Sequence, residues 1–226
     1  MLNFITPCLL KTDSKVTILE ISKNIYKIPK IVAWIFPRRI WFGTKGSVCL
    51  TFDDGPHPEI TPWLLDVLKS NHIKATFFWQ GRQIEKHPEL LKRALEEGHL
   101  IGHHGYNHVS GKKINWQEFK RNFEKSNALV DSDLFRPPYG DLTQKQAKYI
   151  LKKGELVMWS WMSYDFDSSI SANELIQKLK NQVGDRDILV FHENEKTIHK
   201  IKEIIPAIIQ EIRDKGLNFA LVEKKR

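Results

Sequence analysis

The stretch VCLTFDDGP, residues 48–56, places a short apolar run directly before two adjacent carboxylates. Its first five residues are apolar or β-branched, and Gly55 and Pro56 follow, which is typical of a buried strand that ends in a turn. Two neighbouring carboxylates repel each other unless a cation or a proton intervenes. A strand that ends in Asp53 and Asp54 therefore indicates both a sheet and a site at the carboxyl end of that strand.

Similar short runs recur along the chain and alternate with helical patterns. We expect strands at residues 48–52, 74–79, 99–101, 133–135, 155–159, 187–191 and 218–222. These runs are apolar throughout rather than alternating, which predicts a mostly parallel sheet covered by helices. An open doubly wound sheet and a closed or nearly closed barrel both satisfy this pattern.

The helices between these strands have recognisable ends. Proline at a first helical position predicts starts near Thr61 and His87, and Asn115 and Thr143 resemble N-caps. The last helix, roughly 197–215, has isoleucines at three- and four-residue spacing, which indicates one buried face. Those isoleucines are Ile201, Ile204, Ile205, Ile208 and Ile212.

The net charge of +8 is concentrated near the N-terminus, where residues 1–47 hold eight basic and two acidic residues. We expect residues 1–46 to form a basic extension that packs on or flanks a main domain of residues 47–226. A solvated basic arm is one interpretation. The other is a segment that contacts an anionic envelope surface, because the apolar run 31–36 lies beside Arg38 and Arg39.

The remaining bulk features are unremarkable. No convincing signal peptide is present, so the localisation is left between cytoplasmic and cell-envelope associated. Two cysteines are too few for a disulfide framework, and Cys49 is expected to be a buried, inert thiol. Binding of nucleic acid is not expected, because no zinc-finger spacing or aromatic RNA-binding signature accompanies the positive charge.

Unusual polar residues follow several of the expected strands, and the carboxyl ends of parallel strands share one face, where ligands bind. His104 and His108 are four residues apart, so on a helical turn both imidazoles would lie on one side. Chance clustering of surface histidines is the competing interpretation. Two imidazoles and a carboxylate, from either Asp53 or Asp54, form a recognised metal-binding set with open positions, and the other carboxylate could face the reacting water. His99 and His103 are expected to be structural.

From about residue 47 to residue 222 the sequence resembles the polysaccharide deacetylases, also called carbohydrate esterase family four or the NodB-homology domain. Four motifs occur in the family's order: TFDDG at 51–55, HGYNH at 104–108, RPPYG at 136–140 and LVFH at 189–192. The resemblance implies a distorted (β/α) barrel, here of about seven parallel strands surrounded by helices. It also implies a metal, usually zinc, with Co²⁺, Ni²⁺ or Mn²⁺ as alternatives.

The resemblance implies a hydrolase that removes N-acetyl, or alternatively O-acetyl, groups from an amino sugar or polysaccharide. Asp54, His104 and His108 would bind the metal, which activates a water. The implied catalytic and substrate-contacting roles fall on five further residues: Asp53 as general base, Arg136 as its partner, His192 as general acid, and the Tyr139 backbone N–H beside Pro137 as an oxyanion donor.

Three departures from the family pattern stand out. His103 and Gly105 replace the usual Asn and Ser or Thr around the first histidine, and loss of that hydroxyl would remove a hydrogen bond to the site; His103 is alternatively a polar group in the cleft. Met162 stands where the family has an Asp that orients the catalytic histidine, so either Asp165 substitutes for it or His192 is a weaker acid. Phe166 replaces a Trp.

Met162 keeps a second hypothesis open, that of a non-catalytic or weakly active metal- or carbohydrate-binding protein on the same scaffold. Retention of both Asp53 and His192 favours the enzyme. Five aromatic residues are candidates for stacking on sugar rings, with Tyr139 preferred and most of the others expected in the core: Trp79, Tyr106, Tyr139, Trp159 and Trp161.

Overall fold

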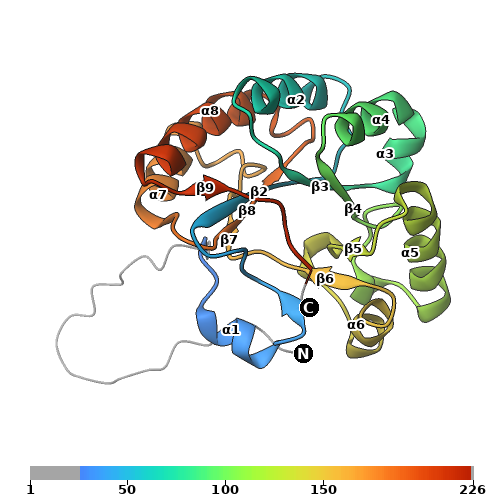
Figure 1. Cartoon of the computed structure of the whole chain (residues 1–226). Helices are drawn as coiled ribbons and strands as arrows, with labels where there is room; N and C mark the ends of the chain where they lie inside the picture. Colours follow the sequence, from blue (N-terminus) through green and yellow to red (C-terminus); the bar gives the residue numbers. More distant parts are fainter. Residues whose placement is uncertain (1–25, 225–226) are drawn as a thin grey trace, which may run out of the picture.

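The computed structural model describes residues 26–224 and contains one parallel sheet that curls into a half-barrel (Figure 1). Eight strands follow the order β1-β6-β5-β4-β3-β2-β8-β7, and β9 pairs with β2 outside this path. The strands are β1 (Arg39–Ile40), β2 (Ser47–Asp53), β3 (Thr76–Trp79), β4 (Leu100–His103), β5 (Leu134–Phe135), β6 (Glu155–Val157), β7 (Trp161–Met162), β8 (Ile188–His192) and β9 (Asn218–Phe219).

The predicted distorted barrel is confirmed, and the curl of the sheet excludes the open doubly wound alternative. All seven expected strands occur, although several are shorter than predicted. The sequence did not indicate β1 and β7. Each is two residues long, too short to show any periodicity, and each forms one end of the sheet.

Helices surround the sheet (Figure 1). They are α1 (Lys30–Ile35), α2 (Ile60–Ser70), α3 (Gly81–Lys86), α4 (Pro88–Glu96), α5 (Trp116–Val130), α6 (Gln144–Ile150), α7 (Ala172–Gln182) and α8 (Ile198–Asp214), with 3₁₀ turns at Gly111–Lys113 and Pro138–Gly140. The predicted caps are confirmed: Asn115 accepts from the backbone N–H of Glu118, and Thr143 forms a capping box with Gln146. None of the helices within residues 26–224 has the length and apolar character needed to cross a bilayer.

The described chain has three apolar clusters: the largest contains residues of α2, α7, α8, β2 and β8, a second contains Trp41, Phe135 and Leu156 with residues of α5 and α6, and a third lies within the half-barrel. The five predicted isoleucines of α8 are fully buried and pack with residues of α2, α7, β2 and β8. Cys49 lies in the inner cluster with Phe78 and Ile188, and burial raises the pKa of its thiol to about 12. The interpretation of Cys49 as a buried, unreactive thiol is therefore confirmed.

Residues 26–40 span the open side of the half-barrel. At one end Lys27 forms an antiparallel bridge with Trp161 of β7, and at the other β1 pairs with β6. Because β7 and β1 are the two ends of the sheet path, this segment joins them across the gap, with α1 between (Figure 1). The described part of the basic extension thus packs on the barrel. The domain boundary after residue 46 stays a prediction, and residues 1–25 lie outside the described part of the chain.

The burial of α8 generates a test of the core. Replacing Ile208, which is fully buried, with alanine should lower the free energy of unfolding by about 3 kcal/mol, because burial is lost and a cavity remains. Urea denaturation followed by circular dichroism measures the change. Leu95→Ala on α4 is the matched control: its side chain is half exposed, so its loss should be much smaller. Equal losses in both variants would contradict the assignment of α8 to the core.

Candidate active site

The polar residues singled out in the sequence meet at the carboxyl edge of the sheet. Strand register accounts for this: Asp53 at the end of β2 lies opposite His192 at the end of β8, and His103 at the end of β4 lies opposite Phe135 of β5. His104 and Arg136 follow directly after those last two strands. Residues far apart in sequence are thereby brought to one rim.

Asp54, His104 and His108 form the one group of three potential metal ligands found among residues 26–224. Their ligand atoms all lie within 4.8 Å of one another. His108 Nε2 is 3.0 Å and His104 Nε2 is 4.0 Å from Asp54 Oδ1. The donor set, two imidazole nitrogens and a carboxylate, suits a divalent transition metal and leaves positions open for water and substrate.

The imidazole of His104 is prepared for this role. Its Nδ1 is 2.7 Å from the carbonyl oxygen of Arg136; an N–H at Nδ1 donates there, and the Nε2 lone pair then faces the site. Burial lowers the pKa of His104 to about 4, although the Asp53 charge opposes this. A neutral ring is the form that binds a metal.

Three neighbours contact the Asp54 carboxylate: Gln80, Asn194 and His108. Gln80 Nε2 donates to Oδ1 at 3.1 Å, and Asn194 Nδ2 donates to Oδ2 at 2.9 Å. Burial alone would raise the pKa of Asp54, but the hydrogen bond to His108 and the nearby imidazoles outweigh it, so the pKa lies below its usual range. The carboxylate is therefore ionised and oriented before any ligand binds.

Three of the seven described non-glycine residues with positive φ lie in this site. Asp54, His108 and Tyr139 all have positive φ, at 79°, 53° and 60°. Non-glycine residues rarely adopt this conformation, and it persists where surrounding contacts hold it. The strain therefore places these three side chains where a relaxed backbone would not.

Asp53 pairs with Arg136 inside the barrel. Arg136 Nη1 donates to Asp53 Oδ1 and to Thr51 Oγ1, both at 2.7 Å, and Nη2 donates to the carbonyl of Met158 at 2.8 Å. The guanidinium is fully buried and lies 4.1 Å from the centre of the Phe78 ring. Asp53 thus has one oxygen fixed by Arg136, and its Oδ2 lies 3.9 Å from His104 Nε2, on the side of the metal ligands.

His192 pairs with Asp165 rather than with residue 162. Its Nδ1 is 2.7 Å from Asp165 Oδ1, its backbone N–H donates to Oδ2 at 2.8 Å, and Ser163 Oγ donates to Oδ1 at 2.8 Å. Burial would lower the pKa of His192, but the charge of Asp165 and its hydrogen bond outweigh it and raise the pKa to about 9, with smaller contributions from Asp54 and Asp53. The question raised by Met162 is answered structurally: a carboxylate does hold this imidazole.

Tyr139 and Pro137 lie at the mouth of the site. The Tyr139 side chain is 70% exposed and its ring centre is 4.8 Å from that of His108, whereas Pro137 is buried at the start of the 3₁₀ turn. Trp79 and Trp161 are fully buried, so neither is available to stack on a sugar.

The two departures around His104 have structural explanations. His103 is buried with its ring edge-on to Phe123 and against Phe135, and burial lowers its pKa to about 3. It is therefore structural, as expected, and does not face the cleft. Gly105 has φ 73°, and a Cβ there would lie 2.8 Å from Asn122 Oδ1, which accepts the N–H of Tyr106. Glycine is the residue that this backbone admits most easily.

Sequence reasoning missed three polar residues beside Asp54: Gln80, Asn194 and the buried Glu193. They line a cavity of about 270 Å³ next to the metal ligands. Glu193 accepts from Thr61 Oγ1 at 2.5 Å and from Trp79 Nε1 at 2.7 Å. Burial raises the pKa of Glu193 to about 7, against these two hydrogen bonds. No motif or periodicity indicates these residues, because their contacts depend on tertiary packing. Glu193 contacts Thr61 of α2 and Trp79 of β3, and Gln80 and Asn194 contact Asp54.

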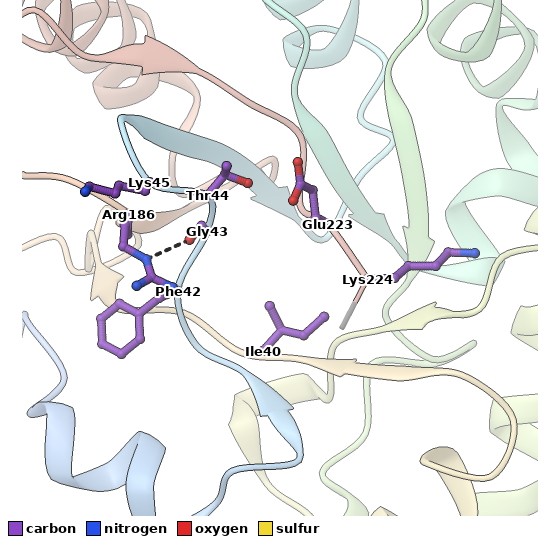
Figure 2. Close-up of a pocket in the computed structure, with 8 residues that line it drawn as sticks. All are labelled: Ile40, Phe42, Gly43, Thr44, Lys45, Arg186, Glu223 and Lys224. Atoms are coloured by element: carbon purple, nitrogen blue, oxygen red, sulfur yellow. Dashed lines mark hydrogen bonds between the residues drawn. The ribbon is translucent and has the colours of Figure 1, made fainter. Parts of the chain in front are cut away.

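A second cavity, of about 390 Å³, lies among residues that precede β2 and β8, at the amino end of the strands (Figure 2). Lys45, Arg186 and Lys224 line it together with Glu223, and Arg186 Nε donates to the carbonyl of Gly43 at 3.1 Å. Figure 2 shows Lys45 and Lys224 pointing away from each other. This cavity contains none of the candidate catalytic residues.

The Glu193 contacts generate a prediction about the support of the site. Glu193→Gln replaces one acceptor oxygen with an NH2 donor. The indole N–H of Trp79 can only donate and therefore needs the remaining oxygen, so the Thr61 hydroxyl can no longer donate to residue 193. We expect a loss of about 1–3 kcal/mol in the free energy of unfolding, measured by urea denaturation at neutral pH. Glu195→Gln, at an exposed neighbour, is the control and should change little. Full stability in Glu193→Gln would show that the carboxylate is not needed to hold α2 and β3 together.

The chain is similar in sequence and in fold to known polysaccharide deacetylases. The model of the family described as "Polysaccharide deacetylase" matches residues 43–158. Two Bacillus cereus proteins named peptidoglycan-N-acetylglucosamine deacetylase are 32% and 31% identical, over 77% and 85% of this chain; the chain spans 66% and 92% of their lengths. The crystal structure of the Bc1960 peptidoglycan N-acetylglucosamine deacetylase superposes with a TM-score of 0.79, at 29% identity, over 86% of this chain and 98% of that one.

A pseudoenzyme of Bacillus anthracis, BA3943, shares the fold, with a TM-score of 0.73 at 22% identity over 82% of this chain and 67% of that one. The fold is thus compatible with both active and inactive proteins, and the family assignment depends on the sequence matches. With a matching family model over half of its length and these relatives, the chain belongs to the polysaccharide deacetylase family.

Proposed function

We propose that this protein is a metal-dependent hydrolase that removes the N-acetyl group from an amino sugar, with the N-acetylglucosamine of peptidoglycan as the first substrate to test. The observation that supports this proposal is that three sets of residues lie at one rim of the barrel. They are the potential metal ligands, the Asp53–Arg136 pair and the His192–Asp165 pair. The names of the two relatives from Bacillus cereus support the choice of substrate.

Asp54, His104 and His108 would hold the metal, and we propose Zn²⁺, with Co²⁺, Ni²⁺ or Mn²⁺ as alternatives. Two imidazole nitrogens and one carboxylate fit these borderline cations better than Mg²⁺ or Ca²⁺, which prefer oxygen ligands. A divalent cation bound there supplies Lewis-acid chemistry, which polarises an acyl oxygen and lowers the pKa of water.

Asp53 would act as the general base. Arg136 fixes its Oδ1 and so leaves Oδ2, on the side of the metal ligands, to take the proton of a water that attacks the acetyl carbonyl carbon. Because the guanidinium cannot deprotonate, Asp53 has a cationic partner at any pH of catalysis. Arg136 is a positioning residue in this proposal, since its guanidinium is fully buried inside the barrel and acts through Asp53.

His192 would act as the general acid. The amine leaving group is too basic to depart unprotonated, and a charged imidazole supplies the proton as the C–N bond breaks. Asp165 keeps His192 in the charged form and fixes the ring through Nδ1, so that Nε2 carries the transferable proton. Acetate and the free amine are the products. The Tyr139 backbone N–H, beside Pro137, would stabilise the oxyanion of the tetrahedral intermediate.

A non-catalytic binding protein on the same scaffold is the second candidate. This candidate was suggested by Met162, which replaces the family's Asp beside the catalytic histidine. The contact between Asp165 and His192 weakens the argument, because a carboxylate lies against the imidazole despite that replacement. The two functions are separated by whether metal binding is accompanied by acetate release.

The first test measures acetate release from N-acetylglucosamine oligomers and from peptidoglycan, after chelation and with added Zn²⁺ or Co²⁺. We expect metal-dependent release that falls about 10²–10⁴-fold in Asp53→Asn, because the base is lost. His104→Ala should lose both metal binding and activity, whereas Asp53→Asn should still bind metal. His57→Ala, outside the ligand set, is the control for metal binding. Stoichiometric metal binding without acetate release from any acetylated amide would favour the binding protein, and absence of metal binding would refute both.

The second test concerns the acid. His192 works only when protonated, so activity should fall as the pH rises through its pKa, which Asp165 raises to about 9. In Asp165→Asn the opposing effect of burial remains, so the alkaline limb of the kcat profile should move to lower pH by about one to three units. Asp167→Asn, which changes a nearby Asp outside the pair, should leave the limb in place. An unchanged limb in Asp165→Asn would remove this residue from the mechanism.

A further inference from the structure

Four of the seven exposed large apolar side chains of the described chain lie together on α1 and its C-cap. Ile31, Trp34 and Ile35 are 57%, 77% and 55% exposed, and the following Phe36 is 41% exposed. Spacings of three and four residues place the first three on one face of the helix. We refer to these four residues as the α1 face.

Helix α1 has two apolar sides. One packs on the protein, and the other, the α1 face, is exposed. Val32 and Ala33 lie against the cluster formed by Trp41, Phe135 and Leu156, together with Ile28. Folding of the barrel therefore accounts for the inner side of α1 but leaves its larger side chains, including a tryptophan, in water. Exposed singly, such residues need no explanation; a contiguous group marks a binding surface.

The charge around the α1 face indicates what it binds. Residues 26–46 include five lysines and arginines and no aspartate or glutamate. Lys30, at the start of α1, and Arg38, two residues after Phe36, are both exposed. Lys27 is engaged with Asp187, and Arg39 lies over the Phe36 ring, so these two cations hold the segment in place rather than extend from it.

A tryptophan and aliphatic side chains flanked by cations are the combination that lies at the boundary between lipid headgroups and acyl chains. The apolar side chains enter the interface, and the cations contact anionic headgroups. A protein partner would not by itself call for a flanking segment, residues 26–46, that carries five cations and no acidic residue. A short helix of this kind gives weak, reversible attachment, not insertion.

We infer that the α1 face is a docking surface for an anionic lipid bilayer. The segment that carries it also joins β7 to β1, so attachment there would hold the rigid barrel itself at the membrane. This inference does not depend on the proposed catalytic function, because docking requires neither the metal ligands nor the general acid and base.

The test is co-sedimentation of the full chain with vesicles of phosphatidylcholine alone or with a third phosphatidylglycerol. We expect binding only to the anionic vesicles, weakened by salt. The double variant Trp34→Ser/Ile35→Ser should bind about tenfold more weakly, because the apolar contact is lost. Lys30→Glu/Arg38→Glu should weaken binding by a similar factor. All of these side chains are exposed, and unchanged circular dichroism would confirm that the variants fold.

Two matched controls separate the α1 face from general stickiness. Leu95→Ser changes an exposed apolar residue on α4, and Lys120→Glu/Lys148→Glu changes two exposed lysines on α5 and α6; both should bind like the unaltered protein. Wild-type binding by the α1 variants, or no binding to anionic vesicles, would overturn the inference. The inference would also be overturned if the protein bound no vesicles but formed a dimer in sedimentation velocity that Trp34→Ser/Ile35→Ser dissociated. Binding to an anionic polysaccharide but not to vesicles would overturn it as well.

Discussion

The buried guanidinium of Arg136 is the interaction on which the rest of the structure most depends. It lies inside the half-barrel with no exposed surface and donates to Thr51, Asp53 and the carbonyl of Met158, which joins β2, the end of β5 and the segment after β6. An unpaired charge in that position would be strongly destabilising, so the carboxylate and the two neutral acceptors must be present together. The same residue's carbonyl oxygen lies 2.7 Å from His104 Nδ1. The Asp53 carboxylate and the His104 imidazole are therefore oriented by the side chain and the backbone of one residue.

This arrangement separates two carboxylates that follow each other in sequence. Asp53 continues β2 and points to Arg136, whereas Asp54, with φ 79°, leaves the strand and turns to His108, Gln80 and Asn194. The repulsion expected between adjacent carboxylates is relieved because each has its own cationic or donor partners. One residue step at a strand end thus yields two different chemical environments, as a base and a ligand require.

A second buried ion pair lies at the rim, and here the carboxylate holds the cation: Asp165 fixes the imidazole of His192, whereas in the first pair Arg136 fixes a carboxylate. Asp165 is a fully buried carboxylate that accepts from Ser163, from the His192 backbone and from its ring, and it raises the pKa of His192. Burial makes both pairs strong because no water competes with them. The rim therefore presents a carboxylate paired with a guanidinium and a charged imidazole paired with a carboxylate, together with the three potential metal ligands.

The sequence alone determined the fold class and indicated which candidate site residues would lie together, because strand ends in a parallel sheet share one edge and because the four motifs fall at those ends. The roles of these residues stay predictions. It could not determine the partner of His192, since Asp165 and Met162 are separated by a turn whose path depends on packing. Glu193, Gln80 and Asn194 also escaped prediction, as their contacts come from elements distant in sequence. The two-residue strands β1 and β7, and the closure of the barrel by residues 26–40, were decided by tertiary structure. The residues of β1 and β7, and Lys27, are extended because they pair with neighbouring strands, not because of local propensity.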